Sequence, residues 1–402
     1  MKRNWLFLLL LIVFISCNND TGCYIQFITP AKPTLSVADK KPKEYKILDV
    51  SKGSIYDNFD RITFIPLETT DKSLIGKVNE IRIIDDRIYV CDKMQSQTIF
   101  VFDINGHYLH KIGQPGHGKQ EYLQIMSYWF HDQYVDFLDC TLWKVVRYDL
   151  DGHYIKTIDL SSFMGCSRFI EYEKNKYIFV YQQYSKEHPY RLVYTDSLFN
   201  IEQTALPFEH TRDMPVGSFW GNSTSGYNCY FDFNDTIYSM SDSLIVPKYH
   251  LSFYKKGEVL EYLKKTSNLQ HKDYLNDVNS DKKDLVKGFT IFDLDSNLFV
   301  SYRLGHEGYF SVVSKENNTH YTYKGANYDK RDGYSYAFFP YGTYKNNLIS
   351  IVDKSIVSLL SDEALSEFKK RIVKRKGIDI DKVLNNDSDN PTICLLHINR
   401  KK

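Results

Sequence analysis

One short stretch of the chain is rich in histidine, a residue type that binds metals and transfers protons. These histidines are His107, His110, His117 and His131. A zinc site needs three or four ligands that converge on one point, and this spacing does not show convergence. His107 has a counterpart, His153, in the sequence repeat described below, whereas the counterpart of His110 is Lys156. We therefore expect structural or solvated histidines and predict no metal site and no cofactor.

Two acidic turns resemble the first residues of a calcium-binding loop. They are Asp103–Gly106 and Asp149–Gly152. The glutamate that an EF-hand loop requires at its twelfth position is absent, because Gln114 and Leu160 stand there. Asn-Gly and Asp-Gly between apolar runs are typical of two-residue hairpins, in which both central residues have positive φ. The pattern predicts β-turns rather than calcium sites.

No motif of a known catalytic site is present: the chain lacks G-x-S-x-G, P-loop, H-E-x-x-H and dinucleotide-binding patterns. We predict no catalytic residues, although an enzyme that draws single residues from several segments would also lack such motifs. The best candidate for ligand contact is an aromatic-rich loop, residues 217–228, with Trp220 and Tyr227 between Gly, Ser and Asn. Such rings could stack on a sugar or contact a protein partner. The alternative is a connecting loop whose Trp packs on its own domain.

The elements that would position these residues follow from residues 78–113. Apolar runs alternate there with turn signals, which predicts a four-stranded antiparallel meander that is too small to bury its own faces. FDINGHYLHKI at 102–112 matches YDLDGHYIKTI at 148–158 at an offset of 46 residues. Upstream, IYVCD at 88–92 matches VDFLD at 135–139 at an offset of 47, with Leu138 in the place of Cys91. These two matches indicate a repeat in which Cys91 is a packing residue.

Weaker units begin near residues 177, 236, 297 and 347, which gives six units in all. A period of 40 to 50 residues with four strands per unit is typical of a β-propeller. We predict an all-β, six-bladed β-propeller of four-stranded antiparallel blades over residues 45–402; seven blades remain the alternative. Residues 392–399 are predicted to pair with the N-terminal strand and close the ring, with Pro66 at a sheet edge or bulge. A helical insertion is predicted near residues 361–376, and residues 255–287 are predicted to be loop with one or two helical turns.

The composition fits this fold and excludes some partners. The chain has 402 residues with 32 Tyr and 25 Phe, and aromatic residues favour strands. Lys and Arg number 51 against 50 Asp and Glu, so the sequence has no basic surplus for nucleic acid. We predict a monomer that binds no nucleic acid. Six cysteines besides Cys17 show no regular framework, and we expect Cys91 and Cys394 to be small buried hydrophobic residues.

The N-terminus has the parts of a secretory signal. Lys2 and Arg3 precede the apolar run 5–15, which is too short to span a bilayer, and residues 1–16 are predicted to be the signal peptide. Ser16-Cys17 resembles the lipobox of bacterial lipoproteins, which implies lipidation of Cys17; ordinary secretion is the alternative. Residues 17–44 are predicted to be a lipidated N-terminus and linker. The expected location is the bacterial cell envelope, lipid-anchored, facing the periplasm or on the outer-membrane surface.

Several segments together resemble a known family. These are ITFIPLETTDKSLIGKVNEI, DDRIYVCD, FDINGHYLHKIGQPGHGKQEYLQI and DSDNPTICLLHI. They are similar to the six-bladed β-propeller lipoproteins of Bacteroides-type bacteria, whose blades resemble NHL repeats. The family's G-x-G-P-G-E-Y pattern is only partly kept in residues 116–122. The resemblance implies a fold and a cell-envelope location but no activity. We expect a binding or scaffold module for a glycan, peptide or protein; the alternative is a lyase- or lactonase-type propeller enzyme with a metal in the central channel.

Overall fold

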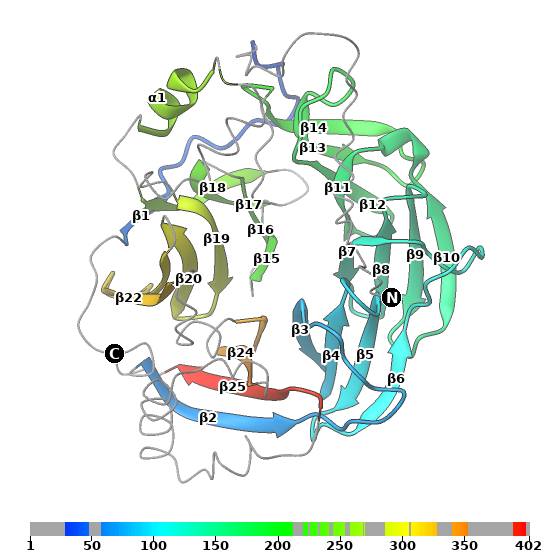
Figure 1. Ribbon diagram of the computed structural model, residues 1–402. Helices are drawn as coiled ribbons and strands as arrows, with labels where there is room; N and C mark the ends of the chain where they lie inside the picture. Colours follow the sequence, from blue (N-terminus) through cyan, green and yellow to red (C-terminus); the bar gives the residue numbers. More distant parts are fainter. Residues whose placement is uncertain are drawn as a thin grey trace, which may run out of the picture.

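The computed structural model describes residues 29–47, 58–211, 220–223, 226–231, 234–240, 244–253, 258–267, 269, 286–304, 307–327, 340–352 and 389–398. Six sheets stand around a central axis (Figure 1). This confirms the predicted six-bladed β-propeller of four-stranded antiparallel blades.

The blades follow one another in chain order, and each is described from its inner to its outer strand. Blade 1 contains β3 (Glu80–Ile84), β4 (Arg87–Asp92), β5 (Thr98–Asp103) and β6 (Tyr108–Ile112). Blade 2 contains β7 (Ile125–Phe130), β8 (Tyr134–Asp139), β9 (Lys144–Asp149) and β10 (Tyr154–Asp159). A short 3-10 helix, η2 (Ser161–Phe163), leads to blade 3, which contains β11 (Cys166–Glu173), β12 (Lys176–Tyr181), β13 (Tyr190–Thr195) and β14 (Ile201–Pro207).

The second half of the ring repeats this order. Blade 4 contains β15 (Trp220–Ser223), β16 (Gly226–Phe231), β17 (Asn234–Met240), β18 (Ile245–Ser252) and a fifth strand, β1 (Lys43–Lys46). Blade 5 contains β19 (Val286–Asp293), β20 (Asn297–Leu304), β21 (Glu307–Ser314) and β22 (His320–Asn327). Blade 6 contains β23 (Gly342–Tyr344), β24 (Asn347–Val352), β25 (Thr392–Ile398) and β2 (Phe59–Pro66).

Blade 6 joins the two ends of the chain and closes the ring. β2 pairs antiparallel with β25, from Phe59 opposite Ile398 to Pro66 opposite Thr392, as the sequence predicted (Figure 1). β2 is the outermost strand of this sheet, so Pro66 lies at an edge, where a residue without an N–H is tolerated. The backbone N–H of Glu68 donates to the carbonyl oxygen of Gly106 at 2.8 Å, which ties the end of β2 to blade 1.

The core of the protein is divided among the six interfaces between blades. One cluster of buried apolar side chains lies in each interface between consecutive blades. The packing position of the repeat is confirmed, because Cys91 is buried between blades 1 and 2 and its counterpart Leu138 between blades 2 and 3. A single meander leaves both of its faces exposed, so burial of apolar surface requires neighbouring blades.

The two acidic turns are hairpin turns, as predicted, but their geometry differs from the expected one. Only the glycines have positive φ, with Gly106 at +92° and Gly152 at +91°. The Oδ1 atom of Asp103 accepts the backbone N–H groups of Asn105 and His107 at 2.8 and 2.9 Å. The aspartate side chain therefore accepts amide N–H groups within a longer turn. The prediction of a two-residue turn with two positive φ angles was wrong.

Contacts with the propeller begin upstream of Tyr45, within the segment predicted to be a linker. β1 runs parallel to β18 at the outer edge of blade 4, and Val37 forms a parallel bridge with Ile245. The backbone N–H of Leu35 donates to the carbonyl oxygen of Thr204 at 3.0 Å. Residues 34–46 thus lie along blades 3 and 4.

The helical part of the described chain is small. One helix, α1 (Glu258–Lys265), lies in the segment where one or two helical turns were predicted. The predicted insertion at 361–376 lies outside the described residues. No helix in the described ranges is long and apolar enough to cross a membrane. Cys91 and Cys394 are buried and unpaired, as expected for packing residues.

Candidate functional site

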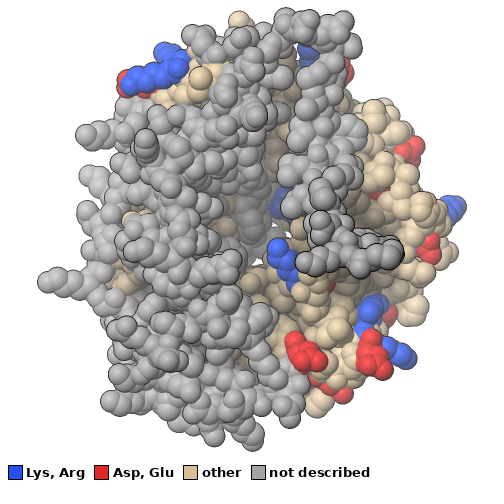
Figure 2. Space-filling view, viewed as in Figure 1, with Lys and Arg blue, Asp and Glu red and all other residues tan. Residues whose placement is uncertain are grey.

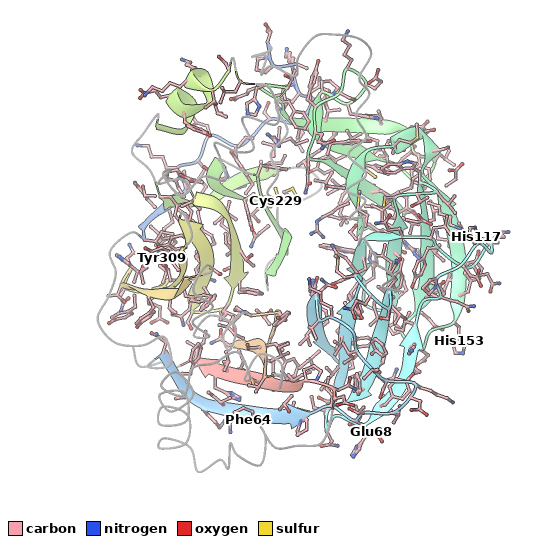
Figure 3. All side chains as sticks on the ribbon, in the orientation of Figure 1. Phe64, Glu68, His117, His153, Cys229 and Tyr309 are labelled. Carbon is pink, nitrogen blue, oxygen red and sulfur yellow. The ribbon has the colours of Figure 1, made fainter. Side chains whose placement is uncertain are left out.

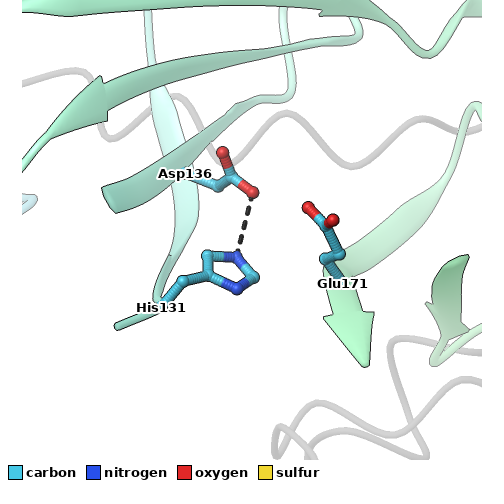
Figure 4. A group of neighbouring side chains, drawn as sticks. All are labelled: His131, Asp136 and Glu171. Atoms are coloured by element: carbon cyan, nitrogen blue, oxygen red, sulfur yellow. Dashed lines mark hydrogen bonds and ion pairs between the residues drawn. The ribbon is translucent and has the colours of Figure 1, made fainter. Parts of the chain in front are cut away.

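Three side chains between blades 2 and 3 lie close enough to hold a metal ion (Figure 4). His131 follows β7, Asp136 lies in β8 and Glu171 lies in β11; one nitrogen or oxygen atom of each lies within 4.8 Å of the others. The Nε2 atom of His131 lies 3.1 Å from Oδ2 of Asp136. This grouping is the convergence that the histidine spacing did not reveal, so its chemistry decides whether the propeller has a metal centre.

A protein cation already lies in this cluster. Arg147 on β9 donates from Nε to Oδ1 of Asp136 at 2.7 Å, and from Nη2 to Oδ2 of Asp136 at 2.8 Å. The same Nη2 donates to Oε2 of Glu171 at 2.6 Å. The guanidinium carbon stands 3.8 Å from the centre of the Tyr134 ring, and the Tyr134 hydroxyl donates to Oε2 of Glu171 at 2.7 Å. The carboxylate oxygens that would bind a metal are therefore bound by the guanidinium.

The electrostatics of the cluster favour a closed network of ions. Burial opposes ionisation of Glu171, but hydrogen bonds from Tyr134, the amide of Asn175 and Arg147 outweigh it and lower the pKa of this carboxyl. Burial likewise opposes the charge of Arg147, yet its bonds to Asp136 and Glu171 raise the pKa of the guanidinium. We read the cluster as a structural link between two blades, because the cation that binds both of its carboxylates belongs to the chain.

Comparison of the two clear repeats could have revealed this network. Asp136 stands where the preceding repeat has Tyr89, and Arg147 stands where it has Val101. The structure pairs Asp136 directly with Arg147 across β8 and β9, as it pairs Tyr89 with Val101 across β4 and β5. Two opposite charges that together replace an apolar cross-strand pair are a signal that the single-residue analysis missed.

The other histidines do not join this cluster. His117 and His153 lie at the outer side of the ring (Figure 3). The Nδ1 atoms of His107 and His153 each lie 3.0 Å from the aspartate of their own hairpin turn. His110 contacts the carbonyl oxygen of Leu150, with Nε2 at 3.1 Å.

The loop that only partly keeps the G-x-G-P-G-E-Y pattern is a structural connection between blades 1 and 2. The carboxylate of Glu121 accepts the N–H of Gly118 at 2.8 Å and a side-chain N–H of Gln114 at 3.0 Å. Tyr122 is buried, and its hydroxyl donates to the carbonyl oxygen of Gln97 at 2.5 Å. These bonds fix the loop and leave its acid engaged within the protein.

The predicted contact residues lie on strands rather than in a loop. Trp220 begins β15 and pairs with Cys229, and Tyr227 lies in β16 opposite Asn222. Both residues thus belong to the innermost hairpin of blade 4, beside the central opening (Figure 1). Their role in ligand binding remains a prediction, and the lipidation residue Cys17 lies outside the described residues.

The inner edges of blades 1 to 3 carry a second group of charges. Because each of these blades has an even number of strands, all of their inner strands begin at the same end of the ring, which we call the start face. Glu80 and Arg82 lie on β3, and Lys93 follows β4 at this face. Arg168 lies near the start of β11. Figure 2 shows Lys and Arg side chains beside the central opening.

Contacts within this channel cluster, defined as Glu80, Arg82, Lys93 and Arg168, are unevenly distributed. Nε of Arg82 lies 2.5 Å from Oε1 of Glu80. Nζ of Lys93 donates to the carbonyl oxygen of Met126 on β7 at 3.3 Å. With three cations against one carboxylate, the cluster carries a formal charge of +2. The His131 cluster lies at the opposite face, where β7 ends.

A buried aspartate fixes the turn that carries Lys93. Oδ2 of Asp92 accepts N–H groups from the connection before β3, and both of its oxygens accept N–H groups from the turn after β4. The donors are Gly76, Lys77, Met94, Gln95 and Ser96, at 2.9 to 3.2 Å. In the next blade, Asp139 accepts the N–H groups of Leu123, Thr141 and Leu142 in the same way. The shared aspartate of IYVCD and VDFLD is thus a structural part of the blade.

Comparisons with known proteins agree with this architecture. A family model described as DUF5128, a 6-bladed beta-propeller, matches residues 36–351. No curated protein matches the chain. The crystal structure of a candidate exported protein of Bacteroides fragilis matches with a TM-score of 0.72 and 21% identity, covering 90% of this chain and 100% of that chain.

Two further solved structures are more distant. A member of the DUF4221 family from Bacteroides vulgatus has a TM-score of 0.49 and 9% identity, covering 84% of this chain and 96% of that one. A virginiamycin B lyase from Staphylococcus aureus has a TM-score of 0.39 and 12% identity, covering 65% and 74%. Likeness at these levels carries no functional argument. The family match spans most of the chain, and the protein therefore belongs to the DUF5128 family of six-bladed β-propellers.

Proposed function

We propose that this protein is an exported lipoprotein of the cell envelope whose propeller binds a glycan, peptide or protein at the start face and catalyses no reaction. The observation that carries the proposal is the difference between the two charge clusters in how their charged groups are paired. The carboxylates of the His131 cluster are bound by Arg147, whereas Arg168 in the channel cluster at the start face has no bound carboxylate among the described residues.

A metal-dependent lyase or lactonase is the rival function. Such an enzyme needs open coordination positions on a metal held by protein side chains. Within the described ranges, His131, Asp136 and Glu171 form the single group of three potential ligands, and it lies at the opposite face from the channel cluster. The bidentate bond from Arg147 to Asp136 would have to break before a metal could enter.

The metal question has a direct test. We expect that zinc or manganese added to the protein leaves its melting temperature unchanged, because Arg147 already occupies the carboxylate oxygens. The variant Arg147→Met is the matched control, since it removes the competing cation and leaves the three potential ligands. Saturable metal binding by the wild-type protein, together with metal-dependent turnover of a lactone or a glycan, would overturn the binding proposal.

The location has its own support and its own test. The signal-like N-terminus and Ser16-Cys17 support export and lipidation, and the related Bacteroides fragilis protein is itself described as a candidate exported protein. Lipid chains stabilise membrane attachment by about 0.8 kcal/mol per buried CH₂ group. We expect Cys17→Ala to release the protein from the membrane fraction. Unchanged attachment of that variant would contradict the lipid anchor.

Ligand identity can be approached with the soluble Cys17→Ala protein. We would screen it on glycan arrays and use it to capture partners from native cell envelopes. The expected result is a saturable ligand whose binding is weakened by substitution in the channel cluster. A ligand that binds with full affinity after substitution of Arg82, Lys93 and Arg168 would refute the proposed location of the site.

A further inference from the structure

Among the described residues, Arg168 is the member of the channel cluster without a hydrogen-bond or ion-pair partner. It lies opposite Val180 on an inner strand and is partly accessible to solvent. Among the described residues, no hydrogen bond or ion pair to its guanidinium is formed. Arg82 and Lys93 differ in this respect, since a carboxylate and a carbonyl oxygen hold them. This arrangement is uncommon, because the five N–H donors of an arginine surrounded by protein normally find acceptors.

The surroundings of Arg168 disfavour its positive charge. Burial lowers the pKa of the guanidinium, and the positive charge of Arg82 adds to this effect against the opposing influence of Glu80, Tyr128 and Tyr230. Burial also lowers the pKa of Lys93, and the charge of Arg168 lowers it further. The cations of this cluster are thus close enough to repel one another. An anion bound among them would remove this repulsion.

One aromatic side chain, Tyr128 on β7, lies beside these charges and is partly accessible. Its ring contacts Phe130, at the end of β7, edge to face at 6.2 Å between ring centres. Tyr128 lies near the side chain of Cys91 in blade 1, and burial raises the pKa of its hydroxyl. Aromatic faces beside polar groups suit the apolar faces of sugar rings.

We propose that Arg168, assisted by Lys93 and Arg82, binds the acidic group of a saccharide at the start face of the ring. The acidic group is a carboxylate or a sulfate, both of which accept paired N–H donors from a guanidinium. This inference rests on the proposed binding function and names its ligand class. The charge is local, since the whole chain carries a net charge of only +1, and this argues against an extended polyanion such as nucleic acid.

The test compares ligands that differ only in charge. Binding of oligogalacturonate and of its neutral methyl ester would be measured by calorimetry, together with a sulfated galactose oligosaccharide and its desulfated form. We expect the wild-type protein to bind the acidic ligand of one pair more tightly than its neutral form. The pair that shows this preference tells whether the recognised group is a carboxylate or a sulfate. Arg168→Gln should weaken binding of that acidic ligand about tenfold or more, since a hydrogen bond to a charged group carries such an effect. The neutral ligand should be unaffected.

Two controls separate charge recognition from structural damage. Arg87→Gln removes a partly exposed arginine that pairs with Asp151, and it should leave acidic binding unchanged. In the absence of ligand, Arg168→Gln should melt at the same temperature as the wild-type protein or higher, because it removes an unpaired cation. A clear loss of stability in this variant would show that Arg168 supports the fold, and would overturn the proposal.

Failure of this inference differs from failure of the proposed function. If neutral and acidic saccharides bind equally and Arg168→Gln has no effect, the acidic specificity is wrong and the binding function stands. If only a peptide or protein partner binds, the saccharide class is wrong. If no ligand of any class binds at the start face, both proposals are wrong.

Discussion

The aspartate at the end of β4 allows a quantitative test of how the blades are built. Asp92 is fully buried, and its two oxygens accept five backbone N–H groups from the turn after β4 and the connection before β3. Replacement by Asn keeps the shape of the side chain but removes the negative charge and turns one acceptor into a donor. The perturbation therefore removes the bonds to one oxygen, weakens those to the other, and creates no cavity.

The magnitude follows from the exposure of the donors. A hydrogen bond to a charged group contributes about 1.5–3 kcal/mol, so five such bonds set an upper limit. Gly76, Lys77, Met94 and Gln95 are exposed, and their amides can bond to water in the variant. We therefore count the equivalent of two bonds and expect Asp92→Asn to lower the free energy of unfolding by about 3–6 kcal/mol at pH 7. At this chain length, that corresponds to a fall in melting temperature of roughly 4–7 °C.

The pH dependence gives this prediction a second readout. The bonds from the amides of Gln95, Lys77 and Ser96 outweigh the opposing effect of burial and lower the pKa of Asp92 below its ordinary value of 3.8. A carboxyl with a lowered pKa stabilises the fold fully above its unfolded pKa, and this stability is lost as the pH falls through the folded pKa. The difference between wild-type protein and Asp92→Asn should thus be constant from pH 7 to about pH 5 and should shrink below about pH 4.

The assay is urea unfolding followed by tyrosine and tryptophan fluorescence, repeated across this pH range. Asp71→Asn is the matched control, because Asp71 is an exposed turn residue that makes no hydrogen bond or ion pair in the described structure. The control should change the free energy of unfolding by less than about 0.5 kcal/mol. If Asp92→Asn lies within that same range, the buried carboxylate does not hold the turn as argued here.

Three further predictions concern other parts of the ring. In thermal unfolding, Gly106→Ala should destabilise the protein by about 3 kcal/mol, since φ of Gly106 is +92° and an added Cβ would overlap a carbonyl oxygen of β2. Gly165 has a φ of +85° but open space around it, so Gly165→Ala should destabilise the protein by only about 1 kcal/mol. Arg147→Met should lower the free energy of unfolding by about 3–5 kcal/mol at pH 7. The loss should be smaller at pH 5, where the two carboxylates left without Arg147 can bind protons. An equal loss at both pH values would contradict an ionised network. In thiol labelling of the native protein, the partly exposed Cys140 should react before the buried Cys91, and the reverse order would show that the blade interfaces open easily.

The sequence was sufficient for the fold because a propeller repeats its short-range signals. The offset between Cys91 and Leu138 placed equivalent residues in successive blade interfaces, where the structure has them. Closure by residues 392–398 was predictable because the apolar run ends the chain and needs a partner strand. Turn geometry was less predictable, since the bonds of the Asp103 side chain to later amides set the hairpin shape, and the Asn-Gly pair alone does not.

The candidate sites depend on neighbours in space and were largely hidden in the sequence. Asp136 and Arg147 look like ordinary surface charges until the β8–β9 register places them opposite one another. Glu171 reaches them from the next blade, a relation that no local spacing encodes. Arg168 belongs to no sequence motif, because it is distinguished only by the absence of a hydrogen-bond or ion-pair partner among the described residues. For the same reason, the contacts of residues 34–44, which lie in the segment predicted to be a linker, were hidden, since the strand partners of β1 lie about 200 residues away.

The attachment of residues 34–46 would have a mechanical consequence under the proposed lipid anchor, which would hold the protein by its N-terminus. Tension applied upstream of residue 34 meets β1 and its parallel partner β18 before it can reach β2. Strands pulled along their length load many hydrogen bonds at once and resist force better than strands that are peeled apart one bond at a time. The β2–β25 seam, whose separation would open the ring, is thus shielded from an external pull. Blade 4 would thus carry the load when a large bound ligand pulls on the anchored protein. The β2–β25 pairing that closes the ring would stay intact.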